Sequence, residues 1–394
     1  MAGKVCADNR DMKRLTRKPN PNSLNDQAKE ALEQERLELK RRLKNNKEIA
    51  DGMSALWYLP VHRTKKAHGY NNPVYWVAWA KNGRHFATTG NDKHCAIWET
   101  LRYTNVRRLR RHSGPVRQCA WSPCSLRLAT CAEAVFYVWD AEGGELMAEI
   151  RDMHKDLINT IDWSPNGNMI ATGSNDKEVR IWAVSKVLGP PTIDRGCVMT
   201  CSTGDQAHGA RVHRVAFAPD SERCLSASAD CTVKMWHLLR AGVCERTFSQ
   251  HKDSVLGLSW NKDGSRFASA SHDGTVCIWN PESPTPLHVL RSTGHIVYGG
   301  AFGPEATARG GRLVAVGHFP EMVMWDTRQG KKLNTFKLKP KGWTLSVAFS
   351  PDGKKIVTTS TEGNNSMIIY EAQPVIHGFW GFILWISRKL RSYN

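Results

Sequence analysis

An aromatic residue that recurs at a nearly constant interval is the feature that most constrains what this chain can fold into. Tryptophan occupies six of these positions at steps of 41, 43, 54, 43 and 46 residues, and a tyrosine follows 45 residues later. A repeat of roughly 40–50 residues is typical of architectures in which each unit is one supersecondary motif. The seven markers are Trp98, Trp139, Trp182, Trp236, Trp279, Trp325 and Tyr370. Each unit carries a second aromatic about 19 residues earlier, namely Trp79, Trp121, Trp163, Phe217, Trp260, Phe302 and Phe349.

One unit shows what each repeat folds into. Between His251 and Asn280 the runs VLGLSW, RFASAS and TVCIW are apolar, of strand length, and separated by Asp-Gly turns. Such turns favour tight hairpins, so each unit is predicted to be a small antiparallel sheet. A single small sheet cannot bury both of its faces, whereas a ring of them stacks sheet on sheet. The sequence therefore predicts an all-β ring of seven sheets.

The units resemble the WD40 repeat family over about residues 54–371. The resemblance implies a seven-bladed β-propeller in which a loop histidine, a serine or threonine, a turn aspartate and the marker tryptophan of a unit form a buried hydrogen-bonded relay. Buried polar groups are tolerated only when each finds a partner, so such a set is expected to be complete or to decay together. The residues assigned to this relay are His154, Thr172, Asp176 and Trp182; His208, Ser226, Asp230 and Trp236; His251, Ser269, Asp273 and Trp279; and Thr88, Asp92 and Trp98.

The remaining units depart from this pattern. In the first unit His68 lies two residues farther out than expected, and in the second Glu133 stands where the aspartate belongs, beside His112 and Trp139. The sixth and seventh units lack most of the set, so these two blades are expected to be the least stable.

Histidine, aspartate and serine together invite comparison with a hydrolytic triad. Here the same trio recurs at blade spacing with a tryptophan at its end, which a single active site with one convergent pocket would not do. No G-x-x-x-x-G-K-[ST] or H-E-x-x-H motif occurs. We therefore expect no enzyme, no cofactor and no metal; Cys197 and Cys201 stand without a second Cys/His pair nearby.

The family resemblance also implies that a strand from one end of the chain completes the last blade, and Ser54–His62 (SALWYLPVH) lies in the right place. Deleting this segment is expected to open the ring. By composition, the connection from Val184 to Ala207 and the insertion PEATARGGR after Phe302 are predicted to be surface loops.

Four regions are predicted along the chain. Residues 1–22 are a basic, flexible N-terminus, 23–52 an amphipathic helix, 53–372 the propeller, and 373–394 a tail rich in aromatic and basic residues. The opening residues lack the apolar run of a secretory signal, and no stretch reaches the roughly 20 apolar residues that span a bilayer. Eleven scattered cysteines do not form a disulfide framework. An intracellular protein, cytoplasmic or nuclear, is expected.

The family resemblance places a partner-binding rim at one end of the ring. Counting back four residues from each unit's first aromatic residue gives one rim position per blade, and three nearby positions extend the set. Their mixture of aromatic and basic groups suits an acidic or phosphorylated segment. The rim candidates are Tyr75, Arg117, Asn159, His213, Leu256, Tyr298 and Leu345, with Arg211, His272 and Trp343 beside them.

A second candidate contact is the sequence WDTR, which contains Trp325, Asp326 and Arg328. It is similar to the W-D-x-R signature of propellers that bring substrates to cullin-4 type ubiquitin ligases. The aspartate expected six residues before the tryptophan is replaced by Phe319.

A formal net charge of +18 indicates acidic partners or attraction to nucleic-acid phosphates. We expect a non-enzymatic scaffold that holds protein subunits together within a multi-subunit complex, a protein or a ribonucleoprotein assembly, with acidic peptides or helices as partners. Two alternatives stay open: a substrate receptor of a cullin-4 type ligase, and a propeller that binds RNA or DNA phosphates or, through its tail, a membrane surface.

Overall fold

The computed structural model describes residues 57–59, 73–190, 196–201, 206–291, 295–304, 311–338, 342–361 and 367–373. The predicted helix at 23–52, the basic N-terminus and nearly all of the predicted tail lie outside these residues. The ring belongs to the unit Trp57–Pro374. No helix in the described ranges is long and apolar enough to cross a membrane.

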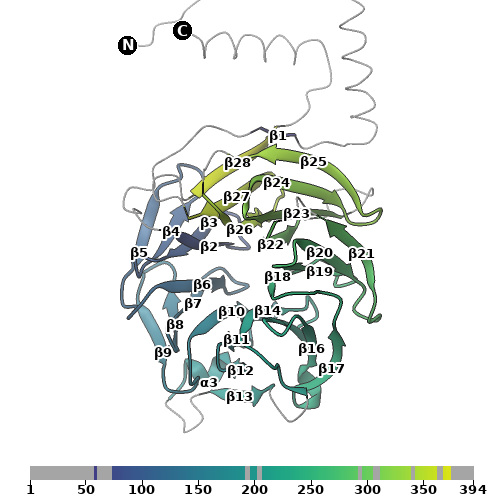
Figure 1. Cartoon of the computed structure of the whole chain (residues 1–394). Helices are drawn as coiled ribbons and strands as arrows, with labels where there is room; N and C mark the ends of the chain where they lie inside the picture. The colour runs from purple at the N-terminus through teal and green to yellow at the C-terminus, as the bar shows by residue number, and fades with distance from the viewer. Residues whose placement is uncertain are drawn as a thin grey trace, which may run out of the picture. The chain divides into compact units, whose positions relative to one another are not determined.

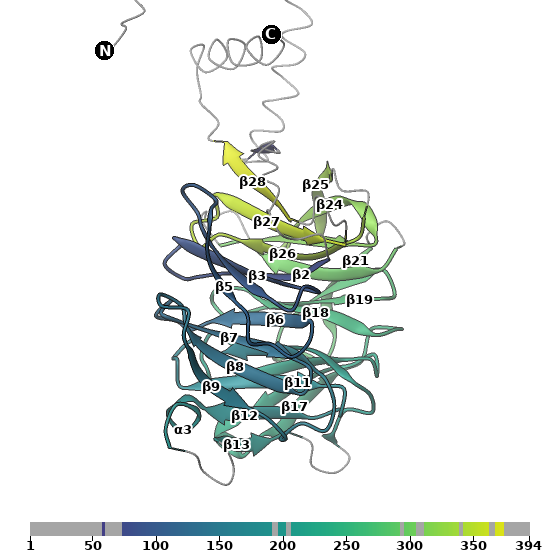
Figure 2. The same ribbon diagram turned by 90° about the vertical axis from the view of Figure 1, so that its left-hand side faces the viewer.

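Seven four-stranded antiparallel sheets, here called blades 1–7, are arranged around a common centre (Figures 1 and 2). The predicted all-β, seven-bladed ring is confirmed. Blade 1 consists of β2 (Val74–Trp79), β3 (His85–Gly90), β4 (Cys95–Glu99) and β5 (Asn105–Leu109); blade 2 of β6 (Val116–Trp121), β7 (Arg127–Ala132), β8 (Val135–Asp140) and β9 (Leu146–Ile150); blade 3 of β10 (Ile158–Trp163), β11 (Met169–Ser174), β12 (Val179–Ala183) and β13 (Cys197–Thr200); blade 4 of β14 (Val212–Phe217), β15 (Arg223–Ser228), β16 (Val233–His237) and β17 (Val243–Phe248). Blade 5 consists of β18 (Val255–Trp260), β19 (Phe267–Ser271), β20 (Thr275–Trp279) and β21 (Pro286–Arg291); blade 6 of β22 (Val297–Phe302), β23 (Arg312–Gly317), β24 (Phe319–Asp326) and β25 (Lys331–Lys337); blade 7 of β26 (Thr344–Phe349), β27 (Lys355–Ser360), β28 (Met367–Gln373) and β1 (Trp57–Leu59).

A strand from the N-terminal side closes the ring. β1 pairs antiparallel with β28 and forms the outermost strand of blade 7, with Trp57 opposite Gln373 and Leu59 opposite Glu371. On the inner side β2 packs against β26, so blade 1 meets blade 7 directly. The predicted closure by an N-terminal strand is therefore confirmed at residues 57–59.

The marker aromatic residues lie in the third strand of each blade and are buried between neighbouring blades. Trp139, Trp182, Trp236 and Trp279 are among the largest fully buried side chains. Phe136 of blade 2, for example, packs against Trp182 of blade 3 with ring centroids 4.9 Å apart. The core is thus a series of clusters between blades, which explains why the aromatic residue must recur in every unit.

The innermost strands present an unpaired edge to the centre of the ring, and side chains from the preceding blade bond part of it. Gln118 accepts a hydrogen bond from the Ile161 amide at 3.3 Å, and Thr160 accepts one from the Val215 amide at 3.0 Å. Farther along the strands, Asp162 accepts from the Phe217 amide at 2.8 Å. These bonds satisfy edge N–H groups that would otherwise be orphaned.

One prediction of irregular structure was wrong. The connection from Val184 to Ala207 contains the short helix α3 (Val184–Val187) and then β13, which is the outermost strand of blade 3. The strand pairs with β12, with Met199 opposite Ile181. The Gly-Pro-Pro sequence therefore interrupts the unit before its last strand and does not replace that strand.

Candidate functional site

The candidate rim lies at the end of the ring where the innermost strands begin, here called the upper end. In every blade the pairing between the first two strands shifts at the second residue of the innermost strand. A bulge of this kind leaves one residue outside the ladder and re-aims its side chain. The bulged residues are Tyr75, Arg117, Asn159, His213, Leu256, Tyr298 and Leu345, which are the seven positions expected from counting.

Blades 6 and 7 bring aromatic and histidine side chains together on this rim. Trp343 is 47% exposed although it is one of the largest apolar side chains. Its ring stacks against Tyr298 at 6.3 Å between centroids and meets His318 edge-on at 4.4 Å. His295 lies 6.4 Å from His318. We call Tyr298, His318, His295 and Trp343 the aromatic cluster.

Blades 1 and 2 add a cation to the rim. The Arg117 guanidinium lies 5.9 Å from the centre of the Tyr75 ring, and the Tyr75 hydroxyl donates to Asn91 at 2.9 Å. Arg117 is exposed, so its charge is available to a ligand. Asn159 is engaged differently, because its amide donates to Asn175 and to the Val212 carbonyl in the next blade.

Blades 4 and 5 contribute further polar groups. Arg211 is exposed, whereas the His213 Nε2 atom is buried without a hydrogen-bond partner in the described structure. Burial, reinforced by Arg211 and Arg214, lowers the pKa of His213 to about 4. The exposed His272 lies 2.8 Å from Asp253 through Nδ1. The structure thus spreads the ten predicted rim residues around the upper end, and it brings Tyr298 and Trp343 into contact.

The predicted relay residues lie behind this rim, between the strands and the loops that precede them. In blade 5 the Trp279 indole donates to Ser269 Oγ at 2.8 Å, and His251 Nε2 lies 2.7 Å from the same oxygen. His251 Nδ1 lies 3.0 Å from Asp273. Because the carboxylate can only accept, Nδ1 carries the proton and Ser269 donates to Nε2. The same chain runs through Trp182, Thr172, His154 and Asp176 in blade 3 and through Trp236, Ser226, His208 and Asp230 in blade 4.

The relay aspartates are strongly acidic. Burial alone would raise the pKa of Asp176, but hydrogen bonds from His154 and from the Glu178 and Lys155 amides outweigh it and lower the pKa to about 2. Asp230 and Asp273 have pKa values lowered in the same way, against the effect of burial, by His208 and His251. Each carboxylate also accepts from the backbone after the histidine, as Asp273 does from the Lys252 amide at 2.9 Å. The relay therefore ties the loop between blades to the turn within a blade.

In the other blades the relay is shorter. In blade 1 the Trp98 indole donates to Thr88 at 2.8 Å, and burial raises the pKa of Asp92; His68 lies outside the described residues. In blade 2 His112 Nε2 and the Trp139 indole both reach Thr130 at 2.8 Å.

Blade 2 has a glutamate at the position of the relay aspartate, and blade 6 lacks most of the relay residues. Glu133 does not reach His112; its carboxylate lies against Gly114, where an added Cβ would come within 2.0 Å of Oε1. His112 Nδ1 is left without a partner among the described residues, and burial lowers the His112 pKa to about 4. In blade 6 the Trp325 indole nitrogen is buried without a partner, because Ala315 stands where the other blades have serine or threonine.

The WDTR residues lie at the opposite, lower end of blade 6. Trp325 is buried, and Asp326 accepts from the amides of Arg328 and Gln329 at 2.7 and 3.0 Å. The Arg328 side chain is exposed, while its carbonyl accepts from His288 at 2.9 Å. The turn therefore presents the Arg328 side chain outward on a fixed backbone.

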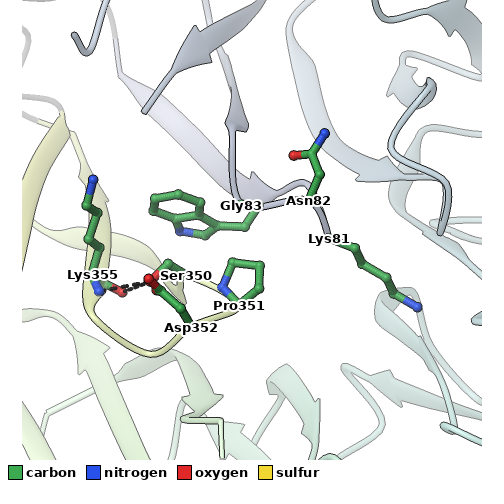
Figure 3. A pocket seen from close by; sticks show the side chains of 8 residues that line it. Lys81, Asn82, Gly83, Ser350, Pro351, Asp352 and Lys355 are labelled. Atoms are coloured by element: carbon green, nitrogen blue, oxygen red, sulfur yellow. Dashed lines mark hydrogen bonds between the residues drawn. The ribbon is translucent and has the colours of Figure 1, made fainter. Parts of the chain in front are cut away.

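Two other groups of residues resemble ligand-binding sites in composition, but their geometry does not suit a ligand. His154, Asp176 and Glu178 lie within 4.8 Å of one another, but both histidine nitrogens serve the relay and Glu178 accepts from Arg180 at 2.6 Å. A cavity of roughly 430 Å³ lies between the lower turns of blades 7 and 1 (Figure 3). Figure 3 shows Lys81 and Lys355 extending in different directions, so the two cations at this cavity do not converge on one ligand.

Sequence reasoning missed His318, which completes the contact with Trp343. The residue follows β23 directly and occupies the position that His272 holds in blade 5. Counting forward from the first aromatic residue of a unit does not find His318, because the insertion in blade 6 changes the spacing.

Comparison with known proteins supports this architecture. Five segments, 60–99, 103–140, 146–183, 196–237 and 242–280, match the family described as WD domain, G-beta repeat, and together make up half of the chain. The chain is 26% identical over 354 residues to apoptotic protease-activating factor 1 of Rattus norvegicus, covering 77% of this chain but 26% of that protein. It is 22% identical over 313 residues to guanine nucleotide-binding protein subunit beta-1 of Nicotiana tabacum, covering 75% and 80%. The matched segments and the seven blades together establish that the chain belongs to the WD40 repeat family.

Proposed function

We propose that this chain is a non-enzymatic scaffold that binds a partner protein across its upper rim. Propellers of this family are typically interaction platforms, as the G-protein β subunit among the relatives illustrates. The observation that carries the proposal is the exposed aromatic cluster, since a tryptophan left 47% exposed beside tyrosine and histidine resembles the anchors of protein interfaces. The relay supports the rim by holding its loops in place.

The charges elsewhere on the upper rim favour an acidic partner segment. Arg117 and Arg211 are exposed on the same end of the ring, and the chain as a whole carries a net charge of +18. Opposite charge on the partner would raise the association rate and fix its orientation, while Trp343 would bury apolar area. An acidic peptide with one large apolar residue fits this surface.

Affinity purification of the full-length chain from native extract, with nuclease treatment and mass spectrometry, tests the proposal. Trp343→Ala and Arg211→Glu are expected to remove a defined set of partner proteins. Leu101→Ala is the matched control, because Leu101 is an apolar residue 81% exposed in the turn at the lower end of blade 1. Loss of the same partners from the control, or recovery of nucleic acid or lipid alone, would contradict a protein-binding rim.

A second candidate function, a substrate receptor of a cullin-4 type ubiquitin ligase, is favoured by the exposed Arg328 side chain on its capped turn. Arg328→Ala is expected to abolish binding to the ligase adaptor and leave the thermal midpoint unchanged, because the side chain does not contribute to the core. Unchanged adaptor binding in the variant would exclude this role for the WDTR turn.

We also propose that the protein is located in a reducing compartment, either the cytoplasm or the nucleus. Ten cysteines in the described ranges are free thiols, seven of them in strands, where they fill the core as small apolar residues. Imaging of the tagged full-length chain tests this placement.

A further inference from the structure

The centre of the ring holds a contact between blades on opposite sides. The Arg214 guanidinium of β14 lies 3.6 Å from the centre of the Trp76 ring of β2. Both residues occupy the third position of an innermost strand, one in blade 4 and one in blade 1. A guanidinium at this distance stacks flat on an indole, so the contact uses the face of the Arg214 side chain.

The in-plane edge of the same guanidinium is not paired. Arg214 is 9% exposed, and its Nε atom is buried without a hydrogen-bond partner in the described structure. No carboxylate of the described residues lies within 4 Å of it. Burial lowers the Arg214 pKa to about 10, so the group is still charged at neutral pH. A buried charge without a counter-ion is costly, and proteins ordinarily pair such charges.

Asp162 partly compensates the Arg214 charge, since its carboxylate raises the Arg214 pKa against the effect of burial, but the two side chains form no ion pair. Its carboxylate accepts from the Phe217 amide at 2.8 Å and forms no ion pair with Arg214. Burial raises the Asp162 pKa to about 6, against the effects of the backbone amides and of Arg214. The carboxylate thus bonds the edge of β14 and leaves the Arg214 Nε without a hydrogen-bond partner.

Other unpaired polar atoms accompany Arg214 in the innermost strands. His213, the residue before Arg214 in β14, also has a buried nitrogen without a partner, Nε2. Ser346 occupies the third position of β26, in the blade beside the one that carries Trp76, and its buried hydroxyl is likewise unpartnered. Unpartnered polar atoms from two sides of the ring therefore accompany one cation that has no ion pair among the described residues.

We propose that Arg214 binds an oxyanion, a carboxylate or a phosphate, in the centre of the ring, with Trp76 holding the guanidinium flat. The open edge offers N–H groups in the fork geometry that matches two oxygens of either anion. The ligand could be a free phosphate or the acidic side chain of a bound protein, and the chemistry is the same for both.

Thermal unfolding of the full-length chain tests the proposal and separates the two sources. One arm uses inorganic phosphate against potassium chloride at equal ionic strength; the other uses the blocked peptide Gly-Glu-Gly against Gly-Gln-Gly. Binding at about tenfold excess over the dissociation constant is expected to raise the midpoint by about 2–4 °C. A shift with phosphate alone assigns a small free anion, and a shift with the glutamate peptide alone assigns a side chain.

Three variants locate the effect. Arg214→Met is expected to abolish the shift, whereas Arg240→Met removes the same charge from an exposed site at the lower end of blade 4 and should keep it. Asp162→Asn should enlarge the shift, because it removes the carboxylate that partly compensates Arg214, while the amide oxygen still accepts from Phe217.

The proposal is overturned if neither ligand shifts the midpoint, or if Arg214→Met responds as Arg240→Met does. Should Arg214→Met fail to fold, crystals of the native chain grown with selenate decide the question. Anomalous density within hydrogen-bond distance of the Arg214 edge supports the site, and its absence there, together with no midpoint shift from the glutamate peptide, refutes it.

Discussion

Ser269→Ala removes the oxygen on which the relay of blade 5 converges. In the native chain Ser269 Oγ accepts from the Trp279 indole and donates to His251 Nε2, at 2.8 and 2.7 Å, and none of the three side chains is more than slightly exposed. The variant leaves two buried polar nitrogens without partners, each costing about 1–3 kcal/mol. We therefore expect a loss of about 2–4 kcal/mol in the free energy of unfolding, or about 4–8 °C in the thermal midpoint.

Urea and thermal unfolding followed by circular dichroism measure this loss. Ser185→Ala is the control, since it removes the same oxygen from an exposed position in α3 and should change stability by less than about 0.5 kcal/mol. If Ser269→Ala were as mild as the control, the relay would not be contributing to stability, and the argument from buried unpaired nitrogens would fail.

Three further outcomes are expected. Ala315→Ser should stabilise the chain by about 1 kcal/mol, because the new hydroxyl gives the buried Trp325 indole the acceptor it lacks; a lower thermal midpoint would show that the site has no room for it. Between pH 6.5 and 4 the unfolded chain protonates His112 before the folded one does, since burial lowers its folded pKa to about 4, so the native chain loses stability as pH falls through this range. His112→Gln should lose less stability over this range, because only the contribution of His213 remains, and an equal fall of the urea midpoint in both chains would contradict it. Deleting residues 54–62 should expose β28 to limited proteolysis, and a digestion pattern like that of the full chain would show that β1 does not close the ring.

The sequence predicted the blades well because their inner parts repeat the same packing. The marker aromatic residue must fill the space between two sheets, so Trp139, Trp182 and Trp236 recur at positions that can be counted. The bulge in the innermost strand also repeats, which is why the seven rim positions could be found by counting from the first aromatic residue.

The outermost strands were harder to predict, because one of their faces meets solvent and leaves little apolar pattern. β5, with the sequence NVRRL, shows this, and β13 was mistaken for part of a loop because glycine and two prolines precede it. The contact between Trp76 and Arg214 is of another kind. It joins residues 138 positions apart that face each other only once the ring has closed, and no local pattern records that.

The pairing of β1 with β28 has a mechanical consequence. Trp57, where β1 begins, lies opposite Gln373, where β28 ends, so a force that pulls the two ends of the ring apart acts at one end of a three-residue ladder. The hydrogen bonds of that ladder would break one after another rather than together. Under tension β1 should therefore separate from β28 at low force, which opens the ring at blade 7. The remaining blades should then unfold one after another from the two ends of the opened ring.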